Sequence, residues 1–403
     1  MPKGALFTHK ETWRKYSLFS NHPPHKSNMK SFPRISILAA STLLGSLFMV
    51  GCGQSSDDAA SSSPSRSASA ARTGDAFPLA AAYVPDASLA VSIDMASVLA
   101  SSFYQKVDAA GQEQGASFEA FVAEMDPEAR AAFEQLDLKP ENVTGILFSM
   151  GGLDFTYGDP MSNPESLRFA AVVNLDKTLT ADQIRAIIAE HVDEEYRDDI
   201  TEYSHAGVTF FTGPAEPGEP QITFGIHEGR SGSSIIFGDD ASARGTADRA
   251  AGQVQVPAHL ATLSSELAGQ SNSYLIFSMP AELRAMLEEQ INAPGNPMGA
   301  MMAPLLGLEG ISLSLNSAEN LDVVLSGLFA EADQAGMVAM MINAQLMPMA
   351  RMMLTDESGE VPGFVQKLTS VAEGKIFKLS TSLTPEEAIS MGEDLPMAIM
   401  GGF

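Results

Sequence analysis

The sequence predicts an α+β fold made mostly of antiparallel sheets with packed helices. Stretches of alternating apolar and polar residues, which are typical of strands, recur along residues 76–403. These strand-like stretches outnumber the helix-like ones, whereas a doubly wound parallel sheet needs a crossover helix after nearly every strand. The order of strand-like and helix-like segments in residues 256–403 also resembles the order in residues 76–255.

The first expected half covers residues 76–255. It begins with a strand and several helical segments, continues with two strands and a helix, and ends with three strands separated by Gly and Pro turns. In the middle helix, Thr180 and Gln183 have the spacing of a capping box. In chain order these segments are "LAVSIDM", "ASVLASSFYQKV", "SFEAFVAEM", "PEARAAFEQL", "NVTGILFSM", "LRFAAVVNL", "TADQIRAIIAEHV", "GVTFFTG", "PQITFGIHEG" and "SSIIFGDD".

The second expected half covers residues 256–403 and repeats much of this order with few identities. A tandem duplication giving two similar halves and a chance similarity of element order are both compatible with the pattern. The matching segments are a strand running into a helix, "NSYLIFSMPAELRAMLEEQI", a strand in "LLGLEGISLSLN", a strand and helix in "LDVVLSGLFAEADQAGMVAMMINAQL", and a late strand with a short helix in "GKIFKLSTSLTPEEA".

The only cysteine of the chain, Cys52, follows an apolar run. Residues 35–50, "ISILAASTLLGSLFMV", carry no charge, and the basic residues Lys30 and Arg34 precede them. A basic segment, an apolar segment of this length and a small residue such as Gly51 are together typical of a secretory signal. The alternative is a membrane-spanning anchor, but sixteen residues are short against the roughly 20 that span a bilayer.

Residues 29–53 resemble the signal of bacterial lipoproteins, with Met49 where Leu is usual. The resemblance implies cleavage after Gly51, acylation of the Cys52 thiol by a diacylglyceryl group, and attachment to a membrane through this N-terminal lipid. It places the protein in the cell envelope, and in the outer membrane, on its periplasmic or surface face, if the source has two membranes.

The segments around the cysteine define the N-terminal organisation. We expect residues 29–51 to be the signal peptide and residues 1–28, which make an unusually long preamble, to be an artefact of start-site assignment. Residues 52–75 are rich in Ser and Ala and contain almost no large apolar residue. Such a segment buries too little surface to offset chain entropy, so we expect a flexible tether. The body beyond it resembles a loose class of uncharacterised exported α+β lipoproteins that have no assigned activity.

The composition is strongly acidic. The chain has 24 Lys and Arg against 50 Asp and Glu, a net charge of −26. Residues 1–51 hold seven of the basic residues and one of the acidic ones, so the expected mature chain is more acidic still. Such a charge disfavours binding to nucleic acid.

Searches for catalytic, metal and cofactor motifs give no candidate. The sequence has no G-x-S-x-G elbow, no phosphate-binding loop and no H-E-x-x-H. An acylated Cys52 leaves no free thiol. The acidic run 193–202 is a weak Ca²⁺ candidate, because its spacing fits no calcium loop. We therefore expect no catalytic residue, no metal and no cofactor. The histidines left after cleavage are His191, His205, His227 and His259.

Methionines are concentrated in residues 298–353. Met337, Met340 and Met341 share one stripe of an expected helix, which Pro348 is expected to kink or end. Three interpretations follow: ordinary core, an adaptable apolar groove for a lipid or peptide, and thioether ligation of Cu(I). Ordinary core is the preferred interpretation. If the segment instead binds a ligand, Met337, Met340 and Met341 are the candidate ligand-binding residues.

The sequence therefore favours a lipid-anchored, acidic cell-envelope protein with a non-enzymatic binding or structural role. Its partner is then the membrane together with an unidentified envelope protein. One alternative is a carrier of a hydrophobic ligand in a Met-lined cavity. Another is an envelope hydrolase with dispersed catalytic residues, which a cleft holding a histidine in contact with a carboxylate would favour.

The lipid anchor is tested by Cys52→Ser. Because the acyl group is attached to the thiol, the variant is expected to lose the diacylglyceryl mass and either to stay uncleaved at Gly51 or to become soluble. Intact-mass spectrometry and detergent partitioning measure this. A variant that keeps the acyl mass of the wild type would contradict the lipoprotein assignment.

Overall fold

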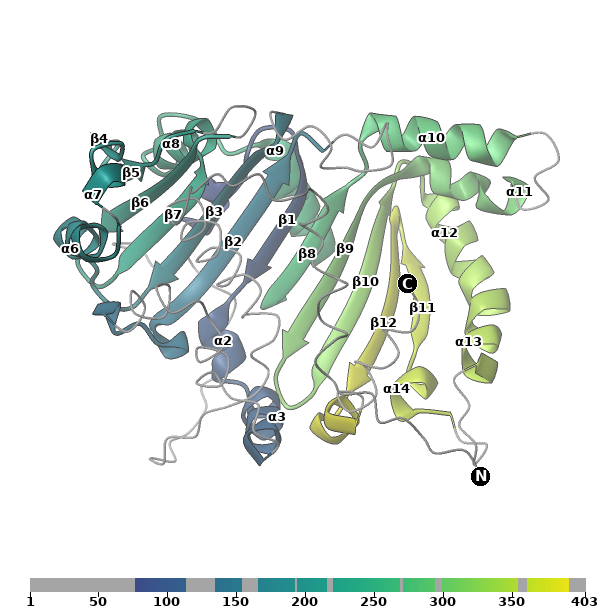
Figure 1. Ribbon diagram of the computed structural model, residues 1–403. Helices are drawn as coiled ribbons and strands as arrows, with labels where there is room; N and C mark the ends of the chain where they lie inside the picture. The colour runs from purple at the N-terminus through teal and green to yellow at the C-terminus, as the bar shows by residue number, and fades with distance from the viewer. Residues whose placement is uncertain are drawn as a thin grey trace, which may run out of the picture. The chain divides into compact units, whose positions relative to one another are not determined.

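The computed structural model describes residues 77–113, 135–153, 166–192, 194–215, 220–268, 271–293, 299–353 and 361–390. It confirms the predicted α+β class: the described strands form one 12-stranded sheet in which every pair of neighbours is antiparallel (Figure 1). The expected signal, Cys52, the tether and most of the helical segments expected at 117–136 lie outside the described residues. Among the described helices, none has the length and apolar character needed to cross a bilayer.

The first half of the body contains seven strands. The sheet order from the centre outward is β1-β2-β3-β7-β6-β5-β4. The elements are β1 (Ala87–Ile93), α2 (Met95–Leu99), α3 (Ser102–Glu113), β2 (Val143–Gly151), β3 (Arg168–Leu175), α6 (Ala181–His191), α7 (Glu194–Arg197), β4 (Thr201–His205), β5 (Val208–Thr212), β6 (Ile222–Glu228), β7 (Ser233–Asp239) and α8 (Asp240–Ala250), with the 3-10 turns η2 (Leu79–Ala82) and η3 (Pro140–Asn142).

The second half contributes five strands, in the order β8-β9-β10-β12-β11 from the centre outward. Its elements are α9 (Ala258–Leu263), η5 (Ser264–Ala268), β8 (Ser273–Ser278), α10 (Ala281–Asn292), α11 (Gly299–Met302), η6 (Ala303–Gly307), β9 (Leu308–Ser317), β10 (Leu321–Phe329), α12 (Ala332–Met341), η7 (Ile342–Leu346), α13 (Met347–Met353), α14 (Gly363–Gln366), β11 (Thr369–Glu373) and β12 (Ile376–Leu383).

The two halves share one topology. In each, a strand runs into a helix, two antiparallel strands follow, a helix comes next, and the last strand of the half pairs with the third. The helices after the third strands, α6 and α12, both begin with a capping box whose reciprocal residue is a glutamine, Gln183 or Gln334. Both also begin with the tripeptide Ala-Asp-Gln. The first half has an additional hairpin, β4–β5, at its outer edge.

The pairing of β1 with β8 relates the halves by an approximate two-fold axis. Ala90 lies four residues before the N-cap of α2, and Ile276 lies four residues before the N-cap of α10. These two equivalent residues are also direct partners across β1 and β8, and both are fully buried. The neighbouring strands follow the same two-fold relation: Ala90 pairs with Ser149 of β2, and the equivalent residue Ile276 pairs with Ser312 of β9. Both serines are fully buried.

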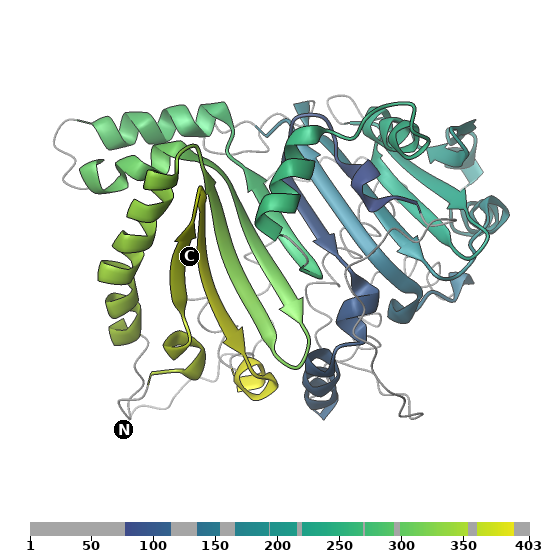
Figure 2. The ribbon, with the colours of Figure 1, turned by 180° about the vertical axis from the view of Figure 1, so that it is seen from behind.

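The face of the sheet that carries Ala90 and Ile276, here called the covered face, holds the main core. Figure 2 shows α9 lying over this face beside the central strands. Leu260 and Leu263 of α9, with apolar residues of η2 and α8, join Ala90 and Ile276 in one buried cluster. Small residues on the central strands let these segments approach closely.

The opposite face, here called the open face, has helices near its two ends. Ile184 of α6 packs in a cluster with residues of β2, β3, β6 and β7 in the first half. Val338 of α12 packs in a separate cluster with Phe329 and Phe377 in the second half. Figure 1 views the sheet from this side.

The described elements that were not expected from the sequence include β4, β11 and α8, and the short helices α7, α9, α11 and α14. Strands β4 and β11 are mostly exposed and contain too few apolar residues to show alternation. Helix α8 is polar and has a glycine, but Asp239 caps it by accepting a hydrogen bond from the Ser242 amide at 3.0 Å. The sequence predicts that Pro348 kinks or ends the helix. In the structure a π-helical turn, η7, precedes Pro348, and the chain continues as helix α13. Such a turn accommodates a missing proline N–H.

The two equivalent serines have unequal roles, and substitution separates them. The Ser149 hydroxyl donates to the Ala82 carbonyl at 2.6 Å and accepts from the Val84 amide at 2.9 Å, so it fastens η2 to the sheet. Ser149→Ala leaves both buried backbone groups unpaired and is expected to cost about 2–3 kcal/mol in the free energy of unfolding. Ser312→Ala is the control with a smaller expected loss, because within the described residues the Ser312 hydroxyl is hydrogen-bonded to the Ser314 hydroxyl, at 3.2 Å, and to no backbone group. Denaturant unfolding that gives equal losses would contradict this role of Ser149.

Candidate functional site

Rows of apolar side chains cross the open face. The residues of each row are direct partners from strand to strand. The central row spans ten strands: Leu379, Leu325, Leu313, Leu275, Val91, Phe148, Ala171, Phe237, Phe224 and Phe211. A parallel row toward one end of the strands contains Phe377, Gly327, Ile311, Phe277, Leu89, Met150 and Phe169, with Gly327 of β10 as the one position without a side chain.

The middle of the central row is partly exposed. Leu313 and Leu325 each retain 38% of their side-chain exposure, although they are neighbours on adjacent strands. Leu275 and Phe148 are half-buried. None of these four belongs to the three buried clusters of the described residues, whereas the ends of the row contact the clusters under α6 and α12. Leu313 and Leu325 are therefore left uncovered by the described helices, whereas Val91 and Ala171 of the same row are buried.

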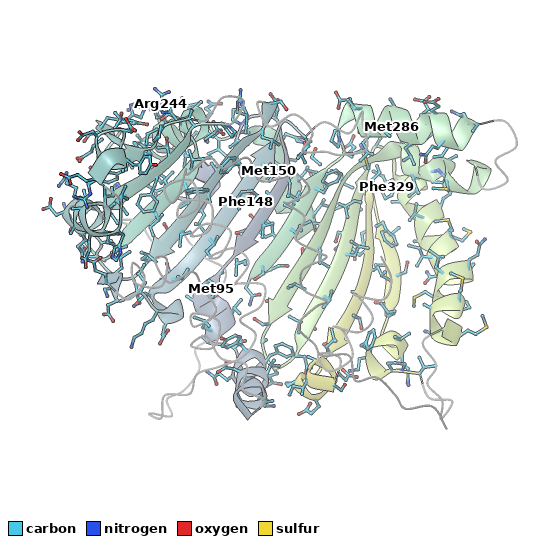
Figure 3. The ribbon with its side chains drawn as sticks, viewed as in Figure 1. Met95, Phe148, Met150, Arg244, Met286 and Phe329 are labelled. Carbon is cyan, nitrogen blue, oxygen red and sulfur yellow. The ribbon has the colours of Figure 1, made fainter. Side chains whose placement is uncertain are left out.

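Aromatic rings form a continuous surface in the first-half part of the open face. The ring centroids of Phe148 and Phe169 are 6.4 Å apart, and those of Phe169 and Phe237 are 5.7 Å apart, both in tilted arrangements. Figure 3 shows Phe148 and Met150 on the strand face that is turned to the viewer. No charged residue occurs in the two rows, so this surface suits an uncharged, apolar contact.

The methionine stripe expected to be core is mostly at the surface, so this expectation is wrong. Met337 is 48% exposed and Met340 is 70% exposed, while Met341 is half-buried. The inward stripe of α12 is instead Ala335, Val338 and Ala339, continued by Ile342. Small alanines in that stripe let the helix approach Phe329 and Phe377 closely, which turns the long methionines outward. The exposed methionines stay candidates for an adaptable apolar contact.

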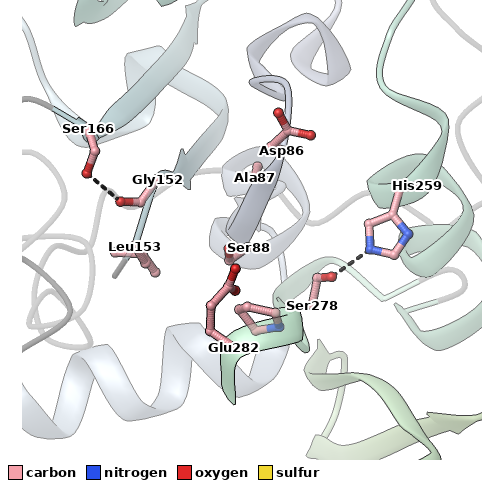
Figure 4. A pocket seen from close by; sticks show the side chains of 10 residues that line it. Asp86, Ala87, Ser88, Gly152, Leu153, Ser166, His259, Ser278 and Glu282 are labelled. Atoms are coloured by element: carbon pink, nitrogen blue, oxygen red, sulfur yellow. Dashed lines mark hydrogen bonds between the residues drawn. The ribbon is translucent and has the colours of Figure 1, made fainter. Parts of the chain in front are cut away.

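A pocket of about 590 Å³ lies at one end of the central strands, away from the methionines (Figure 4). The residues that line it come from both halves. They include Asp86 and Ser88 at the start of β1, Gly152 after β2, His259 of α9, and Ser278 and Glu282 around the junction of β8 and α10.

Ser278 and His259 are in direct contact in this pocket. The Ser278 Oγ and the His259 Nε2 are 2.6 Å apart, and Ser278 is 8% exposed whereas His259 is exposed. The carboxylates of Asp86 and Glu282 line the same pocket, but neither is hydrogen-bonded to His259 within the described residues. The pocket therefore brings together a hydroxyl, an imidazole and two acids.

The two halves differ where the pocket lies. Counted from the paired residues Ala90 and Ile276, the residue equivalent to Ser88 is Tyr274. The Tyr274 ring packs against the covered core, and its hydroxyl lies 2.8 Å from the Tyr83 hydroxyl. Burial of Tyr83 raises the pKa of its phenol well above the usual value. A small residue thus lines the pocket at the position where the other half has a partly buried tyrosine.

The other three histidines have structural partners. His205 Nε2 lies 2.7 Å from an Asp248 carboxylate oxygen, His191 Nε2 lies 3.2 Å from the Gln135 side-chain oxygen, and His227 Nδ1 lies 3.1 Å from the Gly207 carbonyl. The His205–Asp248 pair joins a hairpin to α8, and Asp248 and His205 line no described pocket. Within the described residues no group of three or more His, Cys, Asp or Glu side chains could hold a metal ion.

The acidic run 193–202 is partly in ion pairs. Glu202 of β4 forms a bidentate pair with Arg185, in which Arg185 Nη2 and a Glu202 carboxylate oxygen are 2.7 Å apart. This hydrogen bond from Arg185 holds the pKa of Glu202 below its usual value. Glu202 is thus neutralised by a neighbouring element, and the acids of the run do not form a metal-binding cluster within the described residues.

No known family model matches the chain, and no match was found among curated proteins or solved structures.

Sequence inspection did not bring out either candidate site. Ser278 and His259 lie in the short segments "FSMP" and "PAHLA", 19 residues apart, with no motif that links them. The apolar rows leave a trace in the sequence, because Leu89, Val91, Leu313 and Leu325 occupy alternate strand positions. That pattern identifies a strand face but does not show whether a helix covers it.

The exposure of the methionines is tested on α12 itself. Met340→Ala is expected to change the free energy of unfolding by less than about 0.5 kcal/mol, because the side chain is at the surface. Val338→Ala, two residues earlier, removes two buried methyl-sized groups and is expected to cost about 1.5 kcal/mol. Urea unfolding of both variants measures the difference. A larger loss for Met340→Ala than for Val338→Ala would reverse the assignment of the two faces of the helix.

Proposed function

We propose that this is a lipid-anchored cell-envelope protein whose body binds the acyl chain of a membrane lipid on the open face of its sheet, without changing it chemically. The observation that carries the proposal is the central row of that face, where Leu313 and Leu325 lie side by side and exposed. Apolar patches that stay uncovered in a monomer commonly mark a binding surface.

The dimensions and chemistry of the row favour an acyl chain. The part of the row outside the clusters under α6 and α12, from Leu325 to Phe148, crosses five strands. At about 4.8 Å per strand this part is roughly 20 Å long, which is close to the length of an extended acyl chain. The row has no charge and combines branched aliphatic side chains with rings, so it offers contact but no polar selectivity. Each methylene removed from water contributes about 0.8 kcal/mol, so a chain of ordinary length is retained by the hydrophobic effect alone.

The N-terminal sequence supports the same role. An acylated Cys52 and a Ser- and Ala-rich tether over residues 52–75 would keep the body next to a bilayer, where lipid chains are the abundant apolar partner. The acidic composition reduces the attraction of the whole body to anionic headgroups, which favours reversible contact over adsorption.

The proposal is tested by photo-crosslinking in cells that express the full chain. Cells are fed a fatty acid that carries a diazirine and an alkyne, irradiated, and the crosslinked peptides are identified by mass spectrometry. Crosslinks are expected on peptides that contain Leu313 and Leu325. Leu325→Glu is expected to lower them at least fivefold with little change in melting temperature, because a carboxylate on the row has to be desolvated by a bound chain.

The matched control is Val371→Glu. Val371 is 45% exposed, close to the value for Leu325, but it pairs with Lys378 and so lies on the side of the covered face. Its crosslinks to Leu313 and Leu325 peptides are expected to equal those of the wild type. Three results would contradict the proposal: no crosslink on the open face, equal loss in both variants, or a crosslink that joins the face to the Cys52 peptide through a probe attached to Cys52, which would make the occupant the lipid of this chain.

A further inference from the structure

The pocket at the end of the central strands holds a chemical arrangement that the binding role of the open face does not use. Ser278 is the last residue of β8, and its partner across the sheet is Gly310 of β9. The following amide, of Met279, donates to the Glu309 carbonyl at 3.0 Å. The Ser278 hydroxyl is therefore held at a fixed place where the sheet ends.

His259 approaches the same hydroxyl from a second rigid element. It lies in the first turn of α9, and the next residue, Leu260, is buried in the covered core together with Leu263. The imidazole is exposed on one side and contacts Ser278 on the other. Two elements that are fixed by packing thus bring a hydroxyl and an imidazole to 2.6 Å inside a pocket of about 590 Å³.

We infer that Ser278 and His259 form a catalytic dyad that hydrolyses a small carboxylic ester, with Ser278 as the nucleophile and His259 as the general base. A nucleophile within hydrogen-bond distance of a base, at the wall of a pocket that admits a ligand, is the arrangement that covalent catalysis requires. The inference goes beyond the acyl-chain binding proposed above and does not depend on it.

The reaction follows from the contact. The Ser278 Oγ forms a bond to the ester carbonyl carbon while its proton passes to His259 Nε2. The tetrahedral intermediate then breaks its bond to the alcohol oxygen, which takes that proton and leaves as the alcohol. Water adds to the acyl-serine ester with His259 as the base, and the bond to Oγ breaks, which releases the carboxylic acid and restores Ser278.

The pocket also indicates the class of ester. Its volume admits a small molecule. The carboxylates of Asp86 and Glu282 at its wall repel an anionic substrate and accept an uncharged or cationic one. The dyad has no carboxylate on His259 in the described residues, which favours an ester with a good leaving group over an amide.

The test uses the full lipidated chain purified in mild detergent. A fluorophosphonate carrying an alkyne is expected to label Ser278, and p-nitrophenyl acetate is expected to be hydrolysed faster than the anionic p-nitrophenyl hemisuccinate. Ser278→Ala is expected to abolish the label and the hydrolysis. His259→Gln keeps a hydrogen-bonding side chain but removes the base, and is expected to lower both rates by at least 100-fold. Glu282→Gln is expected to reduce the ratio of the hydrolysis rate of p-nitrophenyl acetate to that of p-nitrophenyl hemisuccinate, because one carboxylate that repels the anion is removed.

The control is Ser265→Ala, because Ser265 lies in η5 near α9 but does not line the pocket and is bonded only to the Thr262 carbonyl. It is expected to be labelled and to hydrolyse like the wild type. The dyad is refuted if the wild-type protein with a normal melting transition carries no label on Ser278, or if Ser278→Ala or His259→Gln reacts like Ser265→Ala. Because His259 is exposed, His259→Gln is expected to fold, so loss of structure does not decide the result.

Discussion

The antiparallel pairing of β1 with β8 is the constraint on which the rest of the body depends. It joins a seven-stranded and a five-stranded half into one sheet, and its register makes the equivalent residues Ala90 and Ile276 direct partners. A slip of one residue would exchange the two faces of one half relative to the other. Residues of the buried core, such as Ile276, would then lie in line with residues of the open face, such as Val91, so both the covered core and the apolar rows require this one register.

The two faces differ because side chains of different size occupy alternate strand positions. On the covered face the central positions are small, as at Ala90, Ser149 and Ser312, and segments such as η2 and α9 lie directly on the strands. On the open face the positions are large, as at Phe148 and Leu313. Among the described helices, α6 and α12 cover large side chains near the two ends of this face, and Leu313 and Leu325 between them stay exposed.

Local patterns in the sequence predict most of the fold but not the sites. Alternating residues identify the strands β1–β3, β5–β10 and β12, and Thr180 with Gln183 marks the start of α6, because each pattern reflects an interaction between near neighbours. The polar edge strands β4 and β11 lack that pattern, since they have no buried side to specify. The outward turn of Met340 and the contact of Ser278 with His259 depend on which residues other elements supply, and no local pattern contains that information.

If the chain is lipid-anchored as proposed, its two outermost strands have a consequence for how copies meet on one membrane. β4 and β11 are each five residues long and mostly exposed, and Glu202 and Glu373 lie on them. Unpaired strand edges invite sheets from other molecules to join them, and short edges with charged side chains oppose this. Chains tethered to one bilayer by a lipid would meet in two dimensions at high local concentration. The short edge strands with their charged side chains would then oppose the association of neighbouring molecules into a continuous sheet.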